Sequence, residues 1–479
     1  MFNLLTRKST VSFLFLLFAG SVFSQGYHIH VTLKPFANSQ VYLGYHYGKI
    51  KAVADSLVLN ANAEGDFRGK DPLPQGVYFL VSPQKTILFE LLIGANQQFS
   101  VAADTAKLPE SVVFTGSPEN KAFQEYSFFM NTHGREMSSL QARLAQAKSK
   151  KDSSAIEQQW HKDNEEVKDY RDQVIRKDSG SLLSTLLLAM KEPVVPENKG
   201  GKPDNEFAYR YYKDHYWDNI SFTDDRLIRT PVFEPKLDRY FKDLVSPEPD
   251  SINREVDHML LYSRTNKEMF KYLLIHFVQK YINPDYMGQD AVFVHLFEKY
   301  INTGQADFFT EKYRKYVDDR AYSLMANLIG QPAPQLTMTD TSGNTRSLYD
   351  IPADYVVICF WDPTCSHCKE TVPKVDSIFQ AKWKREGVKI LGIMVDGGRE
   401  NWLKFIQDHN LKDWIHVYQS DAQRDAENAA GHPDYRQLYD VYQTPILYLL
   451  DRDKRIVAKK LSYQQLDEVL DLKLKKGKS

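Results

Sequence analysis

The stretch that decides the fold is Tyr355–Glu370, which reads YVVICFWDPTCSHCKE. Its first part, Val356–Trp361, is an apolar run of strand length that stops at an Asp-Pro pair. The residues after Cys365 have the pattern of a helix that continues to about Gly387. The sequence therefore predicts that Cys365 and Cys368 lie where a buried strand passes into a helix.

This position predicts a reactive sulfur. Unpaired backbone N–H groups and the positive end of the helix dipole favour a thiolate at the first helical turn, where Cys365 is expected. Cys368 lies three positions further along, one helical turn inward, so its sulfur can reach Cys365 and close or resolve a disulfide. The pair is typical of a redox dithiol.

Three other roles of the two cysteines are weaker. A structural crosslink across so short a loop removes little entropy from the unfolded chain. A zinc site usually has four Cys or His ligands, and the only other cysteine is Cys359. A peroxidase motif Pro-x-x-x-Thr-x-x-Cys would need a threonine where Asp362 precedes Cys365. We therefore expect no metal ligand and no cofactor in the dithiol chemistry.

The residues around the dithiol also carry a family resemblance. The segment FWDPTCSHCK at 360–369, the pair Thr444-Pro445 before an apolar strand, and GQPAP at 330–334 resemble thioredoxin-fold thiol:disulfide oxidoreductases. The most similar kind is the TlpA/ResA-like enzymes of the bacterial envelope. The resemblance implies an enzyme whose partners are protein dithiols and disulfides of the envelope, with a membrane electron donor or acceptor as a further partner. It covers the C-terminal third of the chain.

The resemblance also implies roles for single residues. Cys365 and Cys368 correspond to the two catalytic cysteines. Pro445 corresponds to a cis-proline that faces the dithiol, and Thr444 would offer backbone hydrogen bonds to a bound peptide. The resemblance of the segment 360–369 also implies that Trp361 and Pro363 take part in substrate binding.

Three positions depart from the family pattern. Cys359 stands where thioredoxin has a buried aspartate that deprotonates the second cysteine, and Thr371 stands where the TlpA/ResA-like enzymes often have a glutamate. His367 lies between the cysteines. As an imidazolium it would lower the pKa of Cys365 and act in catalysis, and as an exposed helix residue it would do neither. Both interpretations stay open.

The N-terminal residues predict where the protein is located in the cell, and the net charge bears on its partners. Residues 1–24 combine a basic start, a short apolar stretch and a small-residue cleavage site before Gln25, which is typical of a signal peptide. We therefore expect a secreted, periplasmic protein. A net charge of −1 over 479 residues gives no electrostatic reason to expect a nucleic-acid partner.

The remaining pattern predicts three folded parts behind the signal peptide. Short strands in 25–116 indicate an antiparallel β-sandwich. The pattern of 117–328 is that of an all-α module interrupted by a Pro-, Gly- and Lys-rich loop at 191–205, and 329–479 alternates strands and helices as an α/β thioredoxin-like domain requires. An aromatic group at 207–217 at helical spacing is interpreted as core. The competing function is a non-catalytic envelope scaffold or binding protein whose thioredoxin-like domain is a retained fold.

Overall fold

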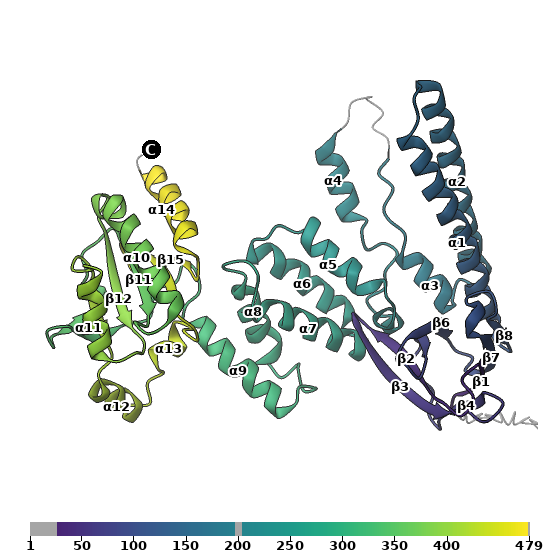
Figure 1. Ribbon diagram of the computed structural model, residues 1–479, viewed down its shortest axis with the longest axis horizontal. Coiled ribbons are helices and arrows are strands. Elements are labelled where there is room, and N and C mark those ends of the chain that lie inside the picture. Colours follow the sequence, from purple (N-terminus) through teal and green to yellow (C-terminus); the bar gives the residue numbers. More distant parts are fainter. Residues whose placement is uncertain (1–25, 197–203, 478–479) are drawn as a thin grey trace, which may run out of the picture. The chain divides into compact units, whose positions relative to one another are not determined.

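The structure, a computed structural model, describes residues 26–196 and 204–477. The expected signal peptide, 1–24, lies outside the described residues. The chain divides into two compact units (Figure 1). Unit 1 contains the residues up to Ser221 together with 225–237, and unit 2 contains 222–224 together with the residues from Asp238 onward. The helical region is thus shared between the two units. The boundaries predicted from the sequence, at 116/117 and 328/329, stay a prediction.

Unit 1 begins with the β-sandwich that the strand pattern predicts. One sheet has the order β4-β1-β7-β8 and the other β3-β2-β5-β6. All pairs are antiparallel except β1 with β7, which is parallel. The strands are β1 (His28–Lys34), β2 (Gln40–Tyr47), β3 (Ile50–Val58), β4 (Glu64–Arg68), β5 (Gly76–Val81), β6 (Ile87–Ile93), β7 (Gln98–Asp104) and β8 (Val113–Thr115).

Strand β5 shows how the sandwich joins the helices that follow it. All of its residues are buried, because its two faces meet different partners. Tyr78 and Leu80 point into the core between the sheets, whereas Val77 packs among the helices. The helices and short turns of unit 1 are η1 (Thr105–Lys107), α1 (Pro118–Ala145), α2 (Lys150–Lys177), α3 (Leu182–Ala189), α4 (Asn205–Asp214), η2 (Asp225–Arg229) and the first part of α5 (Phe233–Asp243).

Two details of unit 1 differ from the sequence analysis. Strand β3 has no clear period-two pattern, since most of its residues are exposed or half-buried, and the sequence did not reveal it. Helix α4 buries none of its residues, and Phe207 and Tyr209 are 38% and 48% exposed. The interpretation of the whole aromatic group as core is therefore wrong, although Tyr216, just beyond the helix, is buried.

Unit 2 consists of further helices followed by a mixed seven-stranded sheet. Its helices before the sheet are α6 (Pro249–Ser263), α7 (Lys267–Tyr281), α8 (Asp290–Leu296), a π-helical turn at η3 (Phe297–Ile301) and α9 (Glu311–Met325). The sheet order is β10-β9-β13-β12-β11-β14-β15, with β11, β12 and β13 parallel to one another. This arrangement confirms the thioredoxin-like fold class of the C-terminal part.

The central position of β11 follows from its sequence. A strand that is buried on both faces must be apolar at every position, and residues 356–361 are all buried. The elements that follow α9 in the chain are β9 (Thr337–Asp340), β10 (Thr345–Ser347), η4 (Leu348–Asp350), β11 (Tyr355–Trp361), α10 (Ser366–Ala381), η5 (Trp383–Glu386), β12 (Val388–Met394), α11 (Arg399–Asp408), β13 (Ile415–Tyr418), α12 (Asp421–Ala429), α13 (Tyr435–Leu438), β14 (Ile446–Asp451), β15 (Ile456–Lys459) and α14 (Tyr463–Gly477).

Buried polar contacts tie the helices of unit 2 to its sheet. The ammonium group of Lys459, on the edge strand β15, is 4% exposed and pairs with Asp290 of α8. It also donates to the backbone and side-chain oxygens of Asn327, at 2.8 and 2.6 Å. Asn327 in turn donates to the carbonyl of Leu438, at 2.8 Å. These helices are therefore part of the same packed body as the thioredoxin-like sheet.

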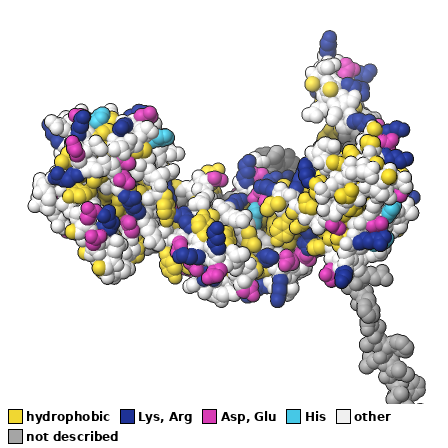
Figure 2. Space-filling model, turned by 60° about the horizontal axis from the view of Figure 1, so that its bottom comes forward, with side chains coloured by type: hydrophobic (Ala, Val, Ile, Leu, Met, Phe, Trp, Pro, Cys, Tyr) yellow, Lys and Arg dark blue, Asp and Glu magenta, His cyan; other side chains and the backbone are white. Residues whose placement is uncertain are grey.

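The surface agrees with the near-neutral charge of the chain. Figure 2 shows acidic and basic side chains interspersed over the visible face. In the described part of the chain, no helix has the length and apolar character that a membrane span requires.

Candidate active site

The dithiol lies at the junction of β11 and α10, as the sequence predicts. β11 ends at Trp361, and Cys365 is the residue that caps the N-terminus of α10. The turn between them is fixed by Asp362, whose carboxylate accepts hydrogen bonds from the backbone N–H and the hydroxyl of Thr364 at 2.6 and 2.7 Å. The helix therefore begins with its free N–H groups beside the sulfur of Cys365.

Cys365 is the half-buried, acidic member of the pair. The backbone N–H of Cys368 is the largest stabilising influence on its thiolate, followed by contacts with Thr444 and with the thiol of Cys368 and by the backbone N–H of His367. Together they outweigh burial and lower the pKa of Cys365 below its ordinary value. Its Sγ lies 3.6 Å from the carbonyl oxygen of Thr444. The reactive sulfur is thus ionised more easily than a free cysteine and remains partly open to solvent.

Cys368 has the opposite environment. Its side chain is 0% exposed, and burial raises its pKa to about 11. The backbone N–H of Asp362 donates to its Sγ at 3.4 Å. The two thiols contact each other. One sulfur is therefore prepared to attack, while the other stays protonated beneath it.

Cys359 does not supply the base that its position has in thioredoxin. It is fully buried in the same core as Cys368, and burial raises the pKa of its thiol far above the ordinary value. A thiol this weakly acidic carries no charge near neutral pH, so it cannot accept the proton of Cys368 there.

The cis-proline implied by the resemblance is present. The peptide bond between Thr444 and Pro445 is cis, and both residues are half-buried directly before β14. The contact between the Thr444 carbonyl and the Cys365 sulfur brings this loop to the dithiol. Because Thr444 lies far from Cys365 in sequence, only the fold brings the two together.

Two of the expected substrate contacts need correction. Trp361 is 0% exposed and packs in the core against Phe405, with 5.1 Å between ring centroids. Pro363 is buried as well. Trp361 is the last residue of a strand whose faces are both covered, which places its ring inside the domain. Trp361 and Pro363 therefore support the turn that holds Cys365 and do not line a surface for substrate.

His367 is exposed on the first turn of α10. Its backbone N–H is among the groups that lower the pKa of Cys365. The proposed catalytic effect of its imidazolium stays a prediction, because a backbone N–H acts on the thiolate whatever the side chain is.

A groove of about 480 Å³ adjoins the dithiol, and the sequence analysis did not foresee most of its lining. Pro445 and Thr371 form its side towards the active site, and Arg320, from α9, reaches it from the helical part of unit 2. Tyr442 is 71% exposed within it. In the sequence, the nearest signal was the position of Tyr442 two residues before the Thr-Pro pair.

The charges of the groove are organised around Asp440. Burial opposes ionisation of this carboxyl, but its ion pairs with Lys460 and Arg320 hold its pKa below the usual value. Two cations around one carboxylate leave this part of the groove with a positive balance.

Comparison with known families agrees with this fold and site. Residues 329–459 match the model of the AhpC/TSA family. The C-terminal part of the chain is a thioredoxin-like domain of this family. The fold and this match confirm the family resemblance and the enzyme class predicted from the sequence, a thioredoxin-like oxidoreductase. The matched residues include Cys365 and Cys368. Residues 143–322 match a domain of unknown function, DUF5106, which corresponds to much of the predicted helical module.

Several solved structures are similar to the chain. A thioredoxin-like protein from Bacteroides caccae is 23% identical over 59% of this chain and 98% of its own, with a TM-score of 0.45. A domain of a possible thiol-disulfide isomerase from Cytophaga hutchinsonii is 36% identical over 32% of this chain and 96% of its own, with a TM-score of 0.28. A thiol:disulfide interchange protein from a Bacteroides species is 28% identical over 30% of this chain and 91% of its own, with a TM-score of 0.26. No curated protein matches the chain.

Proposed function

We propose that this protein is a secreted thiol:disulfide oxidoreductase that exchanges disulfides with proteins of the cell envelope through Cys365 and Cys368. The observation that carries the proposal is the asymmetry of the two thiols. A half-buried sulfur with a lowered pKa lies over a buried sulfur whose pKa is raised to about 11. A dithiol that exchanges disulfides with proteins needs this difference in pKa, because the outer sulfur must react as a thiolate in the first step and the inner sulfur must stay protonated until the second.

The exchange proceeds in two displacements. The Cys365 thiolate attacks one sulfur of a substrate disulfide, forms a mixed disulfide with it, and releases the other substrate sulfur as a thiolate that takes up a proton. Cys368 then loses its proton and attacks Cys365 Sγ. This closes the Cys365–Cys368 disulfide and releases the second substrate thiolate, so two electrons pass to the substrate. The same steps run in reverse when the protein starts as the disulfide, and the reduction potentials of the partners set the direction.

The groove beside the dithiol is the proposed binding site of the substrate polypeptide. It opens next to Pro445, and it offers the exposed ring of Tyr442 as an apolar contact. Replacing Tyr442 with alanine should lower kcat/KM for a protein disulfide several-fold and leave the reduction of a small disulfide such as hydroxyethyl disulfide unchanged. Tyr262→Ala is the matched control, since Tyr262 is 63% exposed in the same unit and does not line the groove. An equal loss on both substrates would contradict this role.

A trapping experiment tests the proposed function. In the full chain, Cys368→Ala removes the resolving sulfur, so mixing the reduced variant with an oxidised protein such as insulin should accumulate a covalent adduct that dithiothreitol releases. The adduct should persist in Cys359→Ala/Cys368→Ala and disappear in Cys365→Ala/Cys368→Ala. Absence of an adduct in Cys368→Ala would overturn the proposal and favour the scaffold function.

Secretion to the periplasm is the second part of the proposal, and it is supported by the signal-peptide pattern of residues 1–24. Expression of the full sequence in a Gram-negative host should yield a periplasmic protein whose mature N-terminus is Gln25. Recovery of the unprocessed chain from the cytosol would refute this part and leave the redox chemistry untouched.

A further inference from the structure

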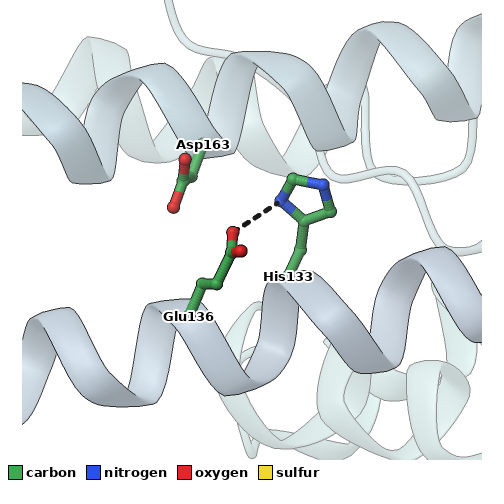
Figure 3. Close-up of side chains that lie close together, drawn as sticks. All are labelled: His133, Glu136 and Asp163. Atoms are coloured by element: carbon green, nitrogen blue, oxygen red, sulfur yellow. Dashed lines mark ion pairs between the residues drawn. The ribbon is translucent and has the colours of Figure 1, made fainter.

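The α1–α2 hairpin of unit 1 contains a cluster of metal-ligating side chains that takes no part in the dithiol chemistry. His133 and Glu136 lie one turn apart on α1, and Asp163 faces them from α2 (Figure 3). One ligand atom from each residue lies within 4.8 Å of the others. His133 Nδ1 is 3.7 Å from a carboxylate oxygen of Glu136, which is longer than a hydrogen bond.

The burial of Asp163 is the feature that demands an explanation. This residue is 4% exposed, and its one hydrogen bond within the described structure comes from the Gln159 amide at 3.0 Å. An ionised carboxylate inside a protein is costly unless a cation or several donors compensate its charge. A neutral amide on the same helix does not supply that compensation, so the site is short of positive charge.

His133 provides a second unsatisfied group in the same cluster. Its side chain is 13% exposed, and its buried Nδ1 has no hydrogen-bond partner among the residues that the structure describes. The ring is held from behind by Phe129, at 4.2 Å between centroids, and Phe129 itself packs on Tyr170 of α2 at 4.1 Å. The packing thus fixes a ring whose nitrogen is directed at two carboxylates (Figure 3).

The hairpin has few fully buried residues. Helices α1 and α2 have 28 residues each, and each buries only three of them. Asp163 is one of those three in α2, so a polar residue occupies one of the few buried positions. Because helices in proteins are stabilised mainly by packing, a bond across the hairpin would have a large effect on this pair.

We propose that His133, Glu136 and Asp163 bind a divalent cation of the zinc class and thereby link α1 to α2. One imidazole and two carboxylates form a ligand set that suits Zn²⁺ better than Ca²⁺, which takes oxygen ligands alone. A tetrahedral ion with bonds of about 2.1 Å holds its ligand atoms about 3.4 Å apart, close to the observed His133–Glu136 separation. Glu136 is 56% exposed, so solvent water can take the fourth position. Gln159 supports the Asp163 ligand by its hydrogen bond, as outer residues of metal sites do.

Zinc titration of the full chain tests the proposal. The dithiol is first oxidised to its disulfide, so that no thiolate competes for the metal. Calorimetry should then give one Zn²⁺ site per chain, and Asp163→Asn and His133→Gln should each weaken binding by more than about tenfold, the loss that even a supporting residue of a metal site causes. Ca²⁺ should bind at least about tenfold more weakly than Zn²⁺.

Two matched variants control for other histidines. His161→Gln changes an exposed histidine on α2 and should leave the zinc affinity unchanged. His28→Gln tests the neighbouring cluster in which His28 and His30 both contact Asp66, and it should also bind zinc as the unaltered chain does. Loss of binding in His28→Gln with retention in His133→Gln would overturn the proposal.

Thermal unfolding separates a metal site from an ordinary ion pair. Zn²⁺ should raise the Tm of the unaltered chain and of His161→Gln, and it should not raise that of Asp163→Asn, whose fold is checked by circular dichroism. Without metal, Asp163→Asn should be at least as stable as the unaltered chain, because an amide costs less to bury than a carboxylate. A metal-independent loss of stability in Asp163→Asn, together with no response of the unaltered chain to zinc, would show an ion pair and overturn the proposal.

Discussion

The dithiol of unit 2 and the His133–Glu136–Asp163 cluster of unit 1 are built in opposite ways. The two active-site sulfurs lie within one turn of a single helix, and the N-terminus of that helix supplies much of their chemistry. The cluster in unit 1 contains residues of two helices, and its central residue, Asp163, is distinguished by a buried carboxylate. The difference teaches that local geometry is enough to prepare a nucleophile, whereas a site made across elements depends on how the helices pack.

The largest expected effect tests whether the two sites are independent. Cys365→Ser should lower insulin reduction by at least about a thousandfold, because it removes the attacking atom. His133→Gln should leave the same activity within about twofold, since its ring contributes nothing to the exchange steps. A turbidity assay of insulin reduction with both variants measures this. A large loss in His133→Gln would break the comparison, as it would place the cluster in the redox cycle.

A second prediction contrasts two buried carboxylates. Asp290 pairs with the buried ammonium of Lys459, whereas Asp163, within the described part of the chain, accepts a hydrogen bond from the neutral Gln159 amide alone. Asp290→Asn should destabilise the protein by about 3–5 kcal/mol, because it leaves a buried charge without its partner. Asp163→Asn, measured without metal, should not lower the stability, because an amide costs less to bury than a carboxylate. Urea unfolding of both variants provides the comparison, and equal losses would contradict it.

A third prediction concerns the pH dependence of the two exchange steps. The raised pKa of Cys368, about 11, means that its reactive thiolate fraction grows with pH throughout the neutral range. Resolution of the mixed disulfide should therefore accelerate about tenfold per pH unit, or about a hundredfold from pH 7 to pH 9. The attack by Cys365 should level off earlier, because its pKa is lowered. Rapid-quench measurement of adduct formation and decay separates the steps, and parallel profiles would refute the asymmetry.

The smallest expected effect distinguishes the backbone of His367 from its ring. Proline at this position removes the N–H that helps to lower the pKa of Cys365, whereas glutamine keeps it. His367→Pro should raise the pKa of Cys365 by less than about one unit, the size of a contact at a helix terminus. His367→Gln should raise it less. Alkylation rates against pH measure both, and an equal rise in the two variants would assign the effect to the imidazolium.

Much of the fold could be predicted because its signals are local. The apolar run of β11, the turn after it and the two cysteines at the start of α10 are adjacent in sequence, and their order is typical of a thioredoxin-like active site. Alternation predicted most strands of the sandwich. The strand pattern missed β3 and β4, and for β3 the reason is that a strand with exposed residues on both faces carries no periodic signal.

The errors have the same physical origin. Trp361 was assigned to substrate because it is next to the active site in sequence, and it is buried because both faces of its strand are covered. The aromatic residues of α4 were assigned to the core by their spacing, which describes a helix face without saying what covers it.

The sequence by itself determined the dithiol and the position of its helix, because both lie in one short segment with few conformational choices, and the family resemblance added the cis-proline at position 445. Only the tertiary structure decided that Cys368 is buried, which aromatic rings are exposed, and that Arg320 reaches the groove. It alone brought Asp163 to His133, because burial and the distance between helices depend on contacts that no single segment contains.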